Sequence, residues 1–109
     1  MTEQELLTDP VFDRVLDALG THPRRRLLVA LVDRAGDAEA LCPAEHFADD
    51  AERLRTVLHH RDLPLLADLE YVEWHREADR VAPGPRFGEI APVLELLLAN
   101  GDALPDEWV

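Results

Sequence analysis

The stretch that decides the fold runs from residue 51 to residue 76 and reads AERLRTVLHHRDLPLLADLEYVEWHR. Its first two thirds carry apolar residues at helical spacing, interrupted by Pro64. Its last six residues alternate and are rich in strand formers. Glu77 to Asp79 can then turn the chain into a return strand, Arg80 to Ala82. The stretch therefore predicts a long helix followed by a short β-hairpin.

The long helix cannot be regular throughout. If it is projected as one ideal helix at about 100° per residue, Arg61 lies on the apolar face and Leu63 lies opposite it. Pro64 also lacks the N–H that would continue the helical hydrogen bonds. We therefore expect a bend or a restart of the helix near Asp62-Leu63-Pro64.

Three helices are expected before this stretch. Pro10 begins the first one and Gly20 ends it. His22-Pro23 opens the second, which we expect to be the most buried helix, and Gly36 closes it. A short helix follows from Ala44 to Ala48.

One last helix follows the hairpin, from Phe87 to the cap Asn100-Gly101. The chain has 109 residues, which suffices for a single hydrophobic core. We expect one domain over residues 1–109, with an ordered core from about residue 9 to 101 and loose tails at 1–8 and 102–109.

Composition favours a helical fold outside the membrane. Apolar residues make up 47% of the chain and aromatic residues 6%, so the core must consist mainly of Leu, Val and Ala. The sequence has no run of about 18 apolar residues, and its N-terminus is acidic where a signal peptide would be basic. We expect a cytoplasmic protein with no membrane partner.

The order of elements predicts a mainly α fold with a small β-hairpin wing, a winged helix-turn-helix. In that fold the second helix of the motif enters the major groove of DNA and the hairpin contacts the backbone. The face opposite Leu54 and Leu58 would then meet the bases, although any solvated amphipathic helix presents such a face. The candidate DNA-binding residues are Arg53, Arg55, Thr56, His59, His60, Arg76 and Arg80.

The net charge of −12 opposes approach to DNA. All 11 basic residues are arginine, and the acids are spread over every segment, which suggests adaptation to high internal salt. At molar salt the Debye length falls to about 3 Å, so local contacts would decide binding.

Three segments carry a resemblance to a known family: residues 21–28 (THPRRRLL), 58–68 (LHHRDLPLLAD) and 71–74 (YVEW). They resemble a haloarchaeal winged helix-turn-helix family of transcription regulators related to the ArsR type. The resemblance covers roughly residues 10–100. Its most specific part is the set His60, Leu63, Pro64 and Leu66. It implies a DNA-binding transcription regulator.

Two positions depart from the pattern of that family. Asp62 stands where a second histidine is expected, and an acid there would repel phosphate. Leu69-Glu70 replaces the small residue and the glycine expected before the hairpin.

Two further surfaces are expected to serve the same function. Arg24 and Arg25, in the densest basic run, could hold a backbone phosphate or could pair with acids such as Asp13 and Asp17.

The last helix is apolar around more than half of its circumference, which predicts a homodimer through this helix, with the first helix as a further contributor. The dimerisation residues are Ile90, Val93, Leu94, Leu97 and Leu98.

Other function classes find less support. Cys42 and His46 have ligand spacing, but no second ligand pair accompanies them, so we expect no metal site and no cofactor. No nucleophile motif or phosphate-binding loop is present, so we expect no enzyme. The alternative to DNA binding is a winged-helix module that binds another protein.

Overall fold

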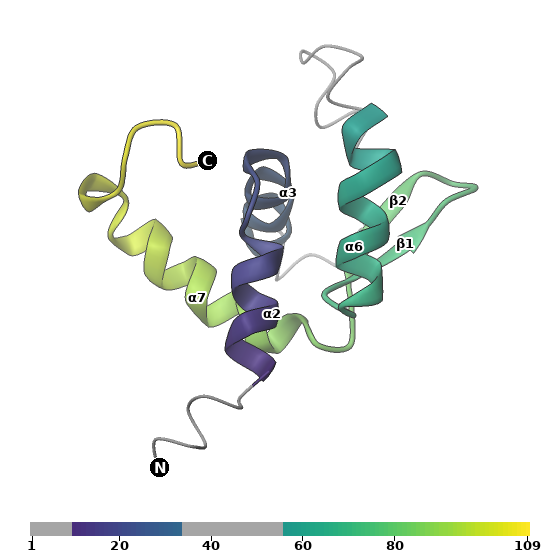
Figure 1. Cartoon of the computed structure of the whole chain (residues 1–109), viewed down its shortest axis with the longest axis horizontal. Coiled ribbons are helices and arrows are strands. Elements are labelled where there is room, and N and C mark those ends of the chain that lie inside the picture. The colour runs from purple at the N-terminus through teal and green to yellow at the C-terminus, as the bar shows by residue number, and fades with distance from the viewer. Residues whose placement is uncertain (1–9, 34–55) are drawn as a thin grey trace.

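The computed structural model describes residues 10–33 and 56–109. Within these ranges the protein is mainly helical, with one two-stranded antiparallel sheet (Figure 1). This agrees with the expected mainly α fold with a small hairpin. The elements are α2 (Pro10–Ala18), α3 (His22–Asp33), η1 (Leu58–Asp62), α6 (Leu63–Asp68), β1 (Val72–His75), β2 (Arg80–Pro83), α7 (Phe87–Ala99) and η2 (Gly101–Ala103).

Helix α3 lies in the middle of the molecule, between α7 on one side and η1 with α6 on the other (Figure 1). Its buried leucines Leu27, Leu28 and Leu31 are at most 1% exposed. Among the described helices α3 has the most buried residues, which confirms the expectation from its sequence. It starts at His22, and α2 starts at Pro10, both as predicted.

The expected irregularity in the long helix takes the form of a π-helical turn, η1, which leads directly into α6. A π turn holds an extra residue, so it rotates the residues that follow relative to an ideal helix. As a result Leu63 is fully buried, while the side chain of Arg61 is 56% exposed. The π turn therefore removes the mismatch that an ideal helix would impose.

The hairpin pairs Val72 with Pro83 and His75 with Arg80, close to the predicted strand limits. It follows α6 through a left-handed residue, Glu70, at φ 66°. Helix α6 ends in the Schellman pattern: the Tyr71 N–H donates to the Leu66 carbonyl, and the Glu70 N–H donates to the Ala67 carbonyl. Glu70 thus holds a conformation that glycine adopts at little cost.

The far end of the hairpin returns to this helix end at Gly84. The N–H of Gly84 donates to the Tyr71 carbonyl over 2.9 Å. A Cβ atom on Gly84 would lie 2.5 Å from the Glu70 carbonyl oxygen and 2.9 Å from the Val72 nitrogen. Only glycine allows the two backbones to approach this closely, and this contact fixes the hairpin against α6.

The C-terminal tail differs from the prediction. Residues 102–109 were expected to be loose, but Gly101–Ala103 forms a 3-10 helix and the chain then returns towards α3 (Figure 1). There the Trp108 carbonyl accepts a hydrogen bond from Arg25 Nε over 2.6 Å. In this structure the tail thus makes a contact with α3 that the sequence does not predict.

Several predictions concern residues outside the described ranges. They are the N-terminal tail at 1–8, the end of the second helix at Gly36, the short helix Ala44 to Ala48, and the beginning of the long helix. Within the described ranges, no helix has the length and apolar character needed to cross a membrane.

Candidate nucleic-acid interface

The helix that begins before η1 and the β1–β2 hairpin border a common cavity of about 370 Å³. Four of the lining side chains are His59 and His60 from η1 and Trp74 and Arg76 from the hairpin, and Pro64 of α6 completes the lining. Three of these residues were predicted to bind DNA, so the structure brings both predicted parts of the interface together. Arg53 and Arg55 lie outside the described residues.

Trp74 contacts two of the other residues that line this cavity. The guanidinium carbon of Arg76 lies over the indole at 4.4 Å from the ring centre, a cation–π contact. The ring of His59 meets the indole edge-on, with 5.5 Å between ring centres. Trp74 therefore holds an arginine from its own hairpin beside a histidine from the helix.

His59 also binds the turn of the hairpin. Its Nε2 lies 2.9 Å from Oδ1 of Asp79, which adopts φ 50° in the turn. With the His59 and Asp79 side chains 31% and 26% exposed, this contact is partly shielded from solvent. The expected base-contacting role of His59 is thus replaced in this structure by a link between η1 and the hairpin.

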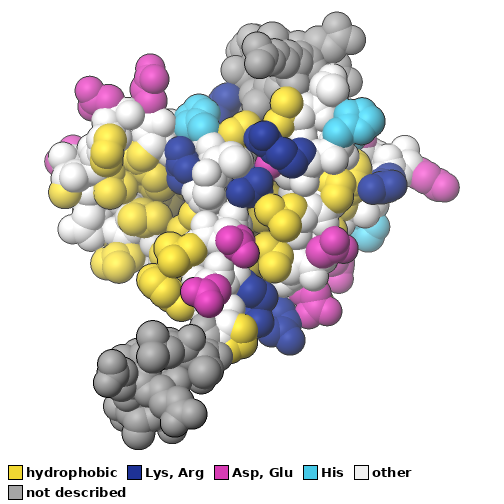
Figure 2. Space-filling model, in the orientation of Figure 1, with side chains coloured by type: hydrophobic (Ala, Val, Ile, Leu, Met, Phe, Trp, Pro, Cys, Tyr) yellow, Lys and Arg dark blue, Asp and Glu magenta, His cyan; other side chains and the backbone are white. Residues whose placement is uncertain are grey.

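The other predicted residues on this surface are exposed: Thr56 and His60 on the helix, and Arg76 and Arg80 on the hairpin. Figure 2 shows basic and histidine side chains in the upper half of the face, from α3 to the hairpin, and acidic side chains at the upper left edge, below the centre and at the hairpin tip. Exposed acids, Glu73 and Glu77, stand on the same hairpin as Arg76 and Arg80.

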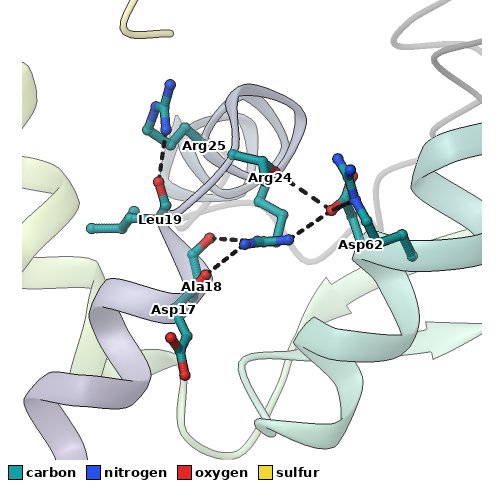
Figure 3. Close-up of polar contacts among 8 residues, drawn as sticks. Asp17, Ala18, Leu19, Arg24, Arg25 and Asp62 are labelled. Atoms are coloured by element: carbon teal, nitrogen blue, oxygen red, sulfur yellow. Dashed lines mark hydrogen bonds and ion pairs between the residues drawn. The ribbon is translucent and has the colours of Figure 1, made fainter.

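Asp62 does not contribute a negative charge to this surface. Its side chain is completely buried, and its Oδ1 accepts from Arg24 Nη1 over 2.9 Å (Figure 3). Arg61 Nε donates to the same oxygen over 3.1 Å, and Thr21 Oγ1 lies 3.4 Å from it. The expected repulsion of phosphate by Asp62 is corrected, because two arginines neutralise a carboxylate that solvent does not reach.

Arg24 was expected to contact phosphate, and this expectation is wrong. Arg24 is only 8% exposed. Besides Asp62, it donates from Nε to the Ala18 carbonyl over 3.3 Å and from Nη2 to the Asp17 carbonyl over 2.8 Å (Figure 3). These carbonyls belong to the last turn of α2, where few N–H groups follow to bond them, and that of Asp17 also accepts from the Gly20 N–H over 3.1 Å. Arg24 joins α2, α3 and η1.

Arg25 is also held by backbone carbonyls. It donates from Nη1 to Leu19 over 2.7 Å and from Nε to Trp108 over 2.6 Å. The expected phosphate contact is therefore replaced by a contact between α3 and the C-terminal tail. The alternative was pairing with acids such as Asp13 and Asp17, but the partners in the structure are backbone carbonyls and, for Arg24, Asp62.

A second charged cluster was not predicted. Arg14 lies 3.4 Å from Glu89, and Arg86 binds Glu70 over 2.7 Å and Glu89 over 3.2 Å. The Glu70 hydrogen bond and the Glu89 carboxylate raise the pKa of Arg86. Burial, with a further contribution from Glu89, raises the pKa of the Tyr71 hydroxyl. Of these ion pairs, only Arg86 with Glu89 has a spacing that the sequence could have revealed, because they are three residues apart. The partners in the other two pairs are far apart in the chain.

The predicted dimer surface needs correction. Ile90 and Leu94 are fully buried, because they pack in the core of this chain, and Leu98 is 37% exposed. Val93 and Leu97 are half-buried. Apolar side chains gather on the surface over α7 and α2 at the lower left of Figure 2. The most exposed large ones on these helices are Leu96 at 64%, Phe12 at 58%, Leu16 at 52%, Leu98 at 37% and Val11 at 36%.

Within residues 10–33 and 56–109, no group of three or more His, Cys, Asp or Glu side chains could hold a metal ion. Cys42 and His46 lie outside these ranges. Comparisons with protein-family models, with curated proteins and with solved structures found no match.

Proposed function

We propose that this protein is a winged helix-turn-helix transcription regulator that binds double-stranded DNA as a homodimer. The long helix would enter the major groove, with the β1–β2 hairpin as the wing against the backbone. One observation supports this above the others: His60 and Arg76 are exposed around one cavity, while the nearby acid Asp62 is buried and paired with arginine.

The proposal gives the candidate residues distinct roles. His60 and Thr56 lie on the helix and can donate or accept hydrogen bonds at base edges. Arg76 and Arg80 lie on the hairpin, where a guanidinium can bind phosphate through two N–H groups. Because Arg76 already rests on Trp74, less side-chain entropy would be lost when it binds.

The homodimer would use the exposed apolar side chains of α2 and α7. Leu96, Phe12 and Leu16 are each more than half exposed, and a two-fold pair would place two recognition helices about one turn of DNA apart. We expect Leu96→Glu to convert the dimer to a monomer in sedimentation at molar KCl. Val109→Glu is the control, since Val109 is an exposed apolar residue outside both helices. A monomeric parent chain would contradict the dimer.

The DNA-binding test uses genomic fragments in molar KCl, where the net charge is screened. We expect Arg76→Gln to weaken binding about tenfold and to reduce the salt dependence by about one phosphate contact. Arg86→Gln is the matched control, because it removes the same charge from an exposed arginine that lines a different cavity. Equal binding by the parent and both variants would contradict the proposal.

The second candidate is a protein-binding module with the same fold. The exposed apolar side chains of α2 and α7 favour it, since such a patch commonly marks a protein interface. The two candidates separate in the same experiments. A parent chain that binds no genomic fragment, and whose Leu96→Glu variant loses a protein partner, would support the module.

A further inference from the structure

We propose that the cavity between η1 and the hairpin binds a small aromatic anion, a flat ring that carries a carboxylate. The site goes beyond the proposed function, because binding of a small molecule there does not require DNA. The cavity is an open groove of about 370 Å³, which offers space for one flat ring with one side left in solvent.

The lining favours a flat ligand. Three aromatic rings, those of His59, His60 and Trp74, border the cavity together with the ring of Pro64. Aromatic side chains of this kind gain most from a planar ring, which can stack on them or meet them edge-on. A bare inorganic anion would leave these walls in contact with water.

The charge of the lining favours an anion. The chain carries a net charge of −12, yet in the part that the structure describes no acidic side chain lines this cavity. Glu77, which follows Arg76 directly, does not line the cavity, and Asp79 has its Oδ1 engaged by His59. Arg76 supplies a permanent positive charge, and an imidazole N–H of His60 can add a donor.

The Arg76 guanidinium is held in place to bind a carboxylate. It lies 4.4 Å over the Trp74 ring, where the cation–π contact acts on its flat face. The N–H bonds of a guanidinium lie in its plane and point outward from its edge. They can therefore bind a carboxylate while the flat face stays on the indole.

The test is a titration of the whole chain followed by the indole N–H signals of its two tryptophans in a nitrogen–proton correlation spectrum. The probe is benzoate, and benzamide is its uncharged analogue of the same shape. We expect benzoate to shift the Trp74 signal saturably, with a dissociation constant on the order of 1 mM for so few atoms. The Trp108 signal serves as the internal control, since Trp108 does not line the cavity.

Two comparisons make the result decisive. We expect benzamide to bind at least tenfold more weakly than benzoate, and Arg76→Gln to weaken benzoate at least fivefold. Arg80→Gln should change it less than twofold, because Arg80 belongs to the same hairpin but does not line the cavity. Equal binding of benzoate and benzamide, or equal losses in the two arginine variants, would overturn the proposal.

Inorganic phosphate separates an aromatic site from a simple anion site. If phosphate displaces benzoate at equal concentration, the cavity recognises charge alone and the aromatic part of the proposal is wrong. Because His60 and Arg76 are also assigned to DNA, bound benzoate should weaken DNA binding. This last effect rests on the proposed function, whereas the titration does not, so the two can fail separately.

Discussion

Two polar contacts join η1 to different neighbours, and they have the same length. Arg24 binds Asp62 over 2.9 Å towards α3, and His59 binds Asp79 over 2.9 Å towards the hairpin. The Asp62 side chain is 0% exposed, but the His59 and Asp79 side chains are 31% and 26% exposed. Burial, and not distance, therefore distinguishes the two contacts.

The difference in burial separates structural from functional roles. A buried charge that loses its partner is left without water to replace it, so the loss destabilises the fold. A partly exposed charge is solvated when its partner leaves, so the change in stability is small. The Arg24–Asp62 side of η1 thus serves stability, and the His59–Asp79 side can carry a binding surface.

The largest expected effect comes from Asp62→Ala. This change leaves Arg24 buried without its carboxylate, and we expect a loss of about 3 to 5 kcal/mol in the free energy of unfolding. Urea unfolding in molar KCl measures it. The control is Arg61→Ala, which removes the more exposed arginine from the same carboxylate and should cost less than about 1 kcal/mol.

If Asp62→Ala does not fold, the double variant with Arg24→Met and Asp62→Leu is measured in its place. Apolar residues of similar size can replace a buried ion pair with little loss, so this double variant should fold and retain the hairpin. Equal losses for Asp62→Ala and Arg61→Ala would contradict the contrast between the two sides of η1.

The second effect tests how the hairpin is fixed on α6. Gly84→Ala would place a Cβ atom 2.5 Å from the Glu70 carbonyl oxygen, so the backbone must move. We expect a loss of about 1 to 3 kcal/mol, measured by urea unfolding. Gly88→Ala is the matched control, because a Cβ atom there meets nothing within 4 Å and alanine favours a helix. Similar losses in both variants would show that the close approach is unimportant.

The third effect concerns Glu70, which holds φ 66° beside that contact. Glu70→Gly and Glu70→Ala both remove the contact with Arg86, so their difference isolates the backbone conformation. We expect the glycine variant to be more stable than the alanine variant by about 1 kcal/mol. Thermal unfolding compares them, and an alanine variant of equal or greater stability would contradict the assignment.

The sequence predicted the elements where pattern and backbone chemistry agree. Pro10 and His22-Pro23 marked two helix starts, the alternating stretch marked the hairpin, and Pro64 with the apolar mismatch marked an irregular helix. The glycine that the resemblance led us to expect before the hairpin corresponds to Glu70, whose φ is positive. The sequence could not specify a π turn, because a kink would resolve the same mismatch.

The candidate site was predicted only in part, because neither burial nor partners are visible in a charge pattern. Arg24 stands in the densest basic run and is buried, whereas Arg76 stands beside an acid and is exposed. One partner of Arg24, Asp62, lies 38 residues away, and one partner of Arg25, the Trp108 carbonyl, lies 83 residues away. Such contacts depend on how the helices pack, which local spacing does not encode.

The smallest expected effect comes from Asp79→Asn on the exposed side of η1. Asparagine tolerates the positive φ of this position and can still bind His59, so the change removes mainly the charge. We expect a loss below about 1 kcal/mol that shrinks further as KCl is raised, since salt screens partly exposed charges. Unfolding at two KCl concentrations measures it. A loss as large as that of Asp62→Ala would mean that both sides of η1 support the fold, and that the hairpin side is not set apart for binding.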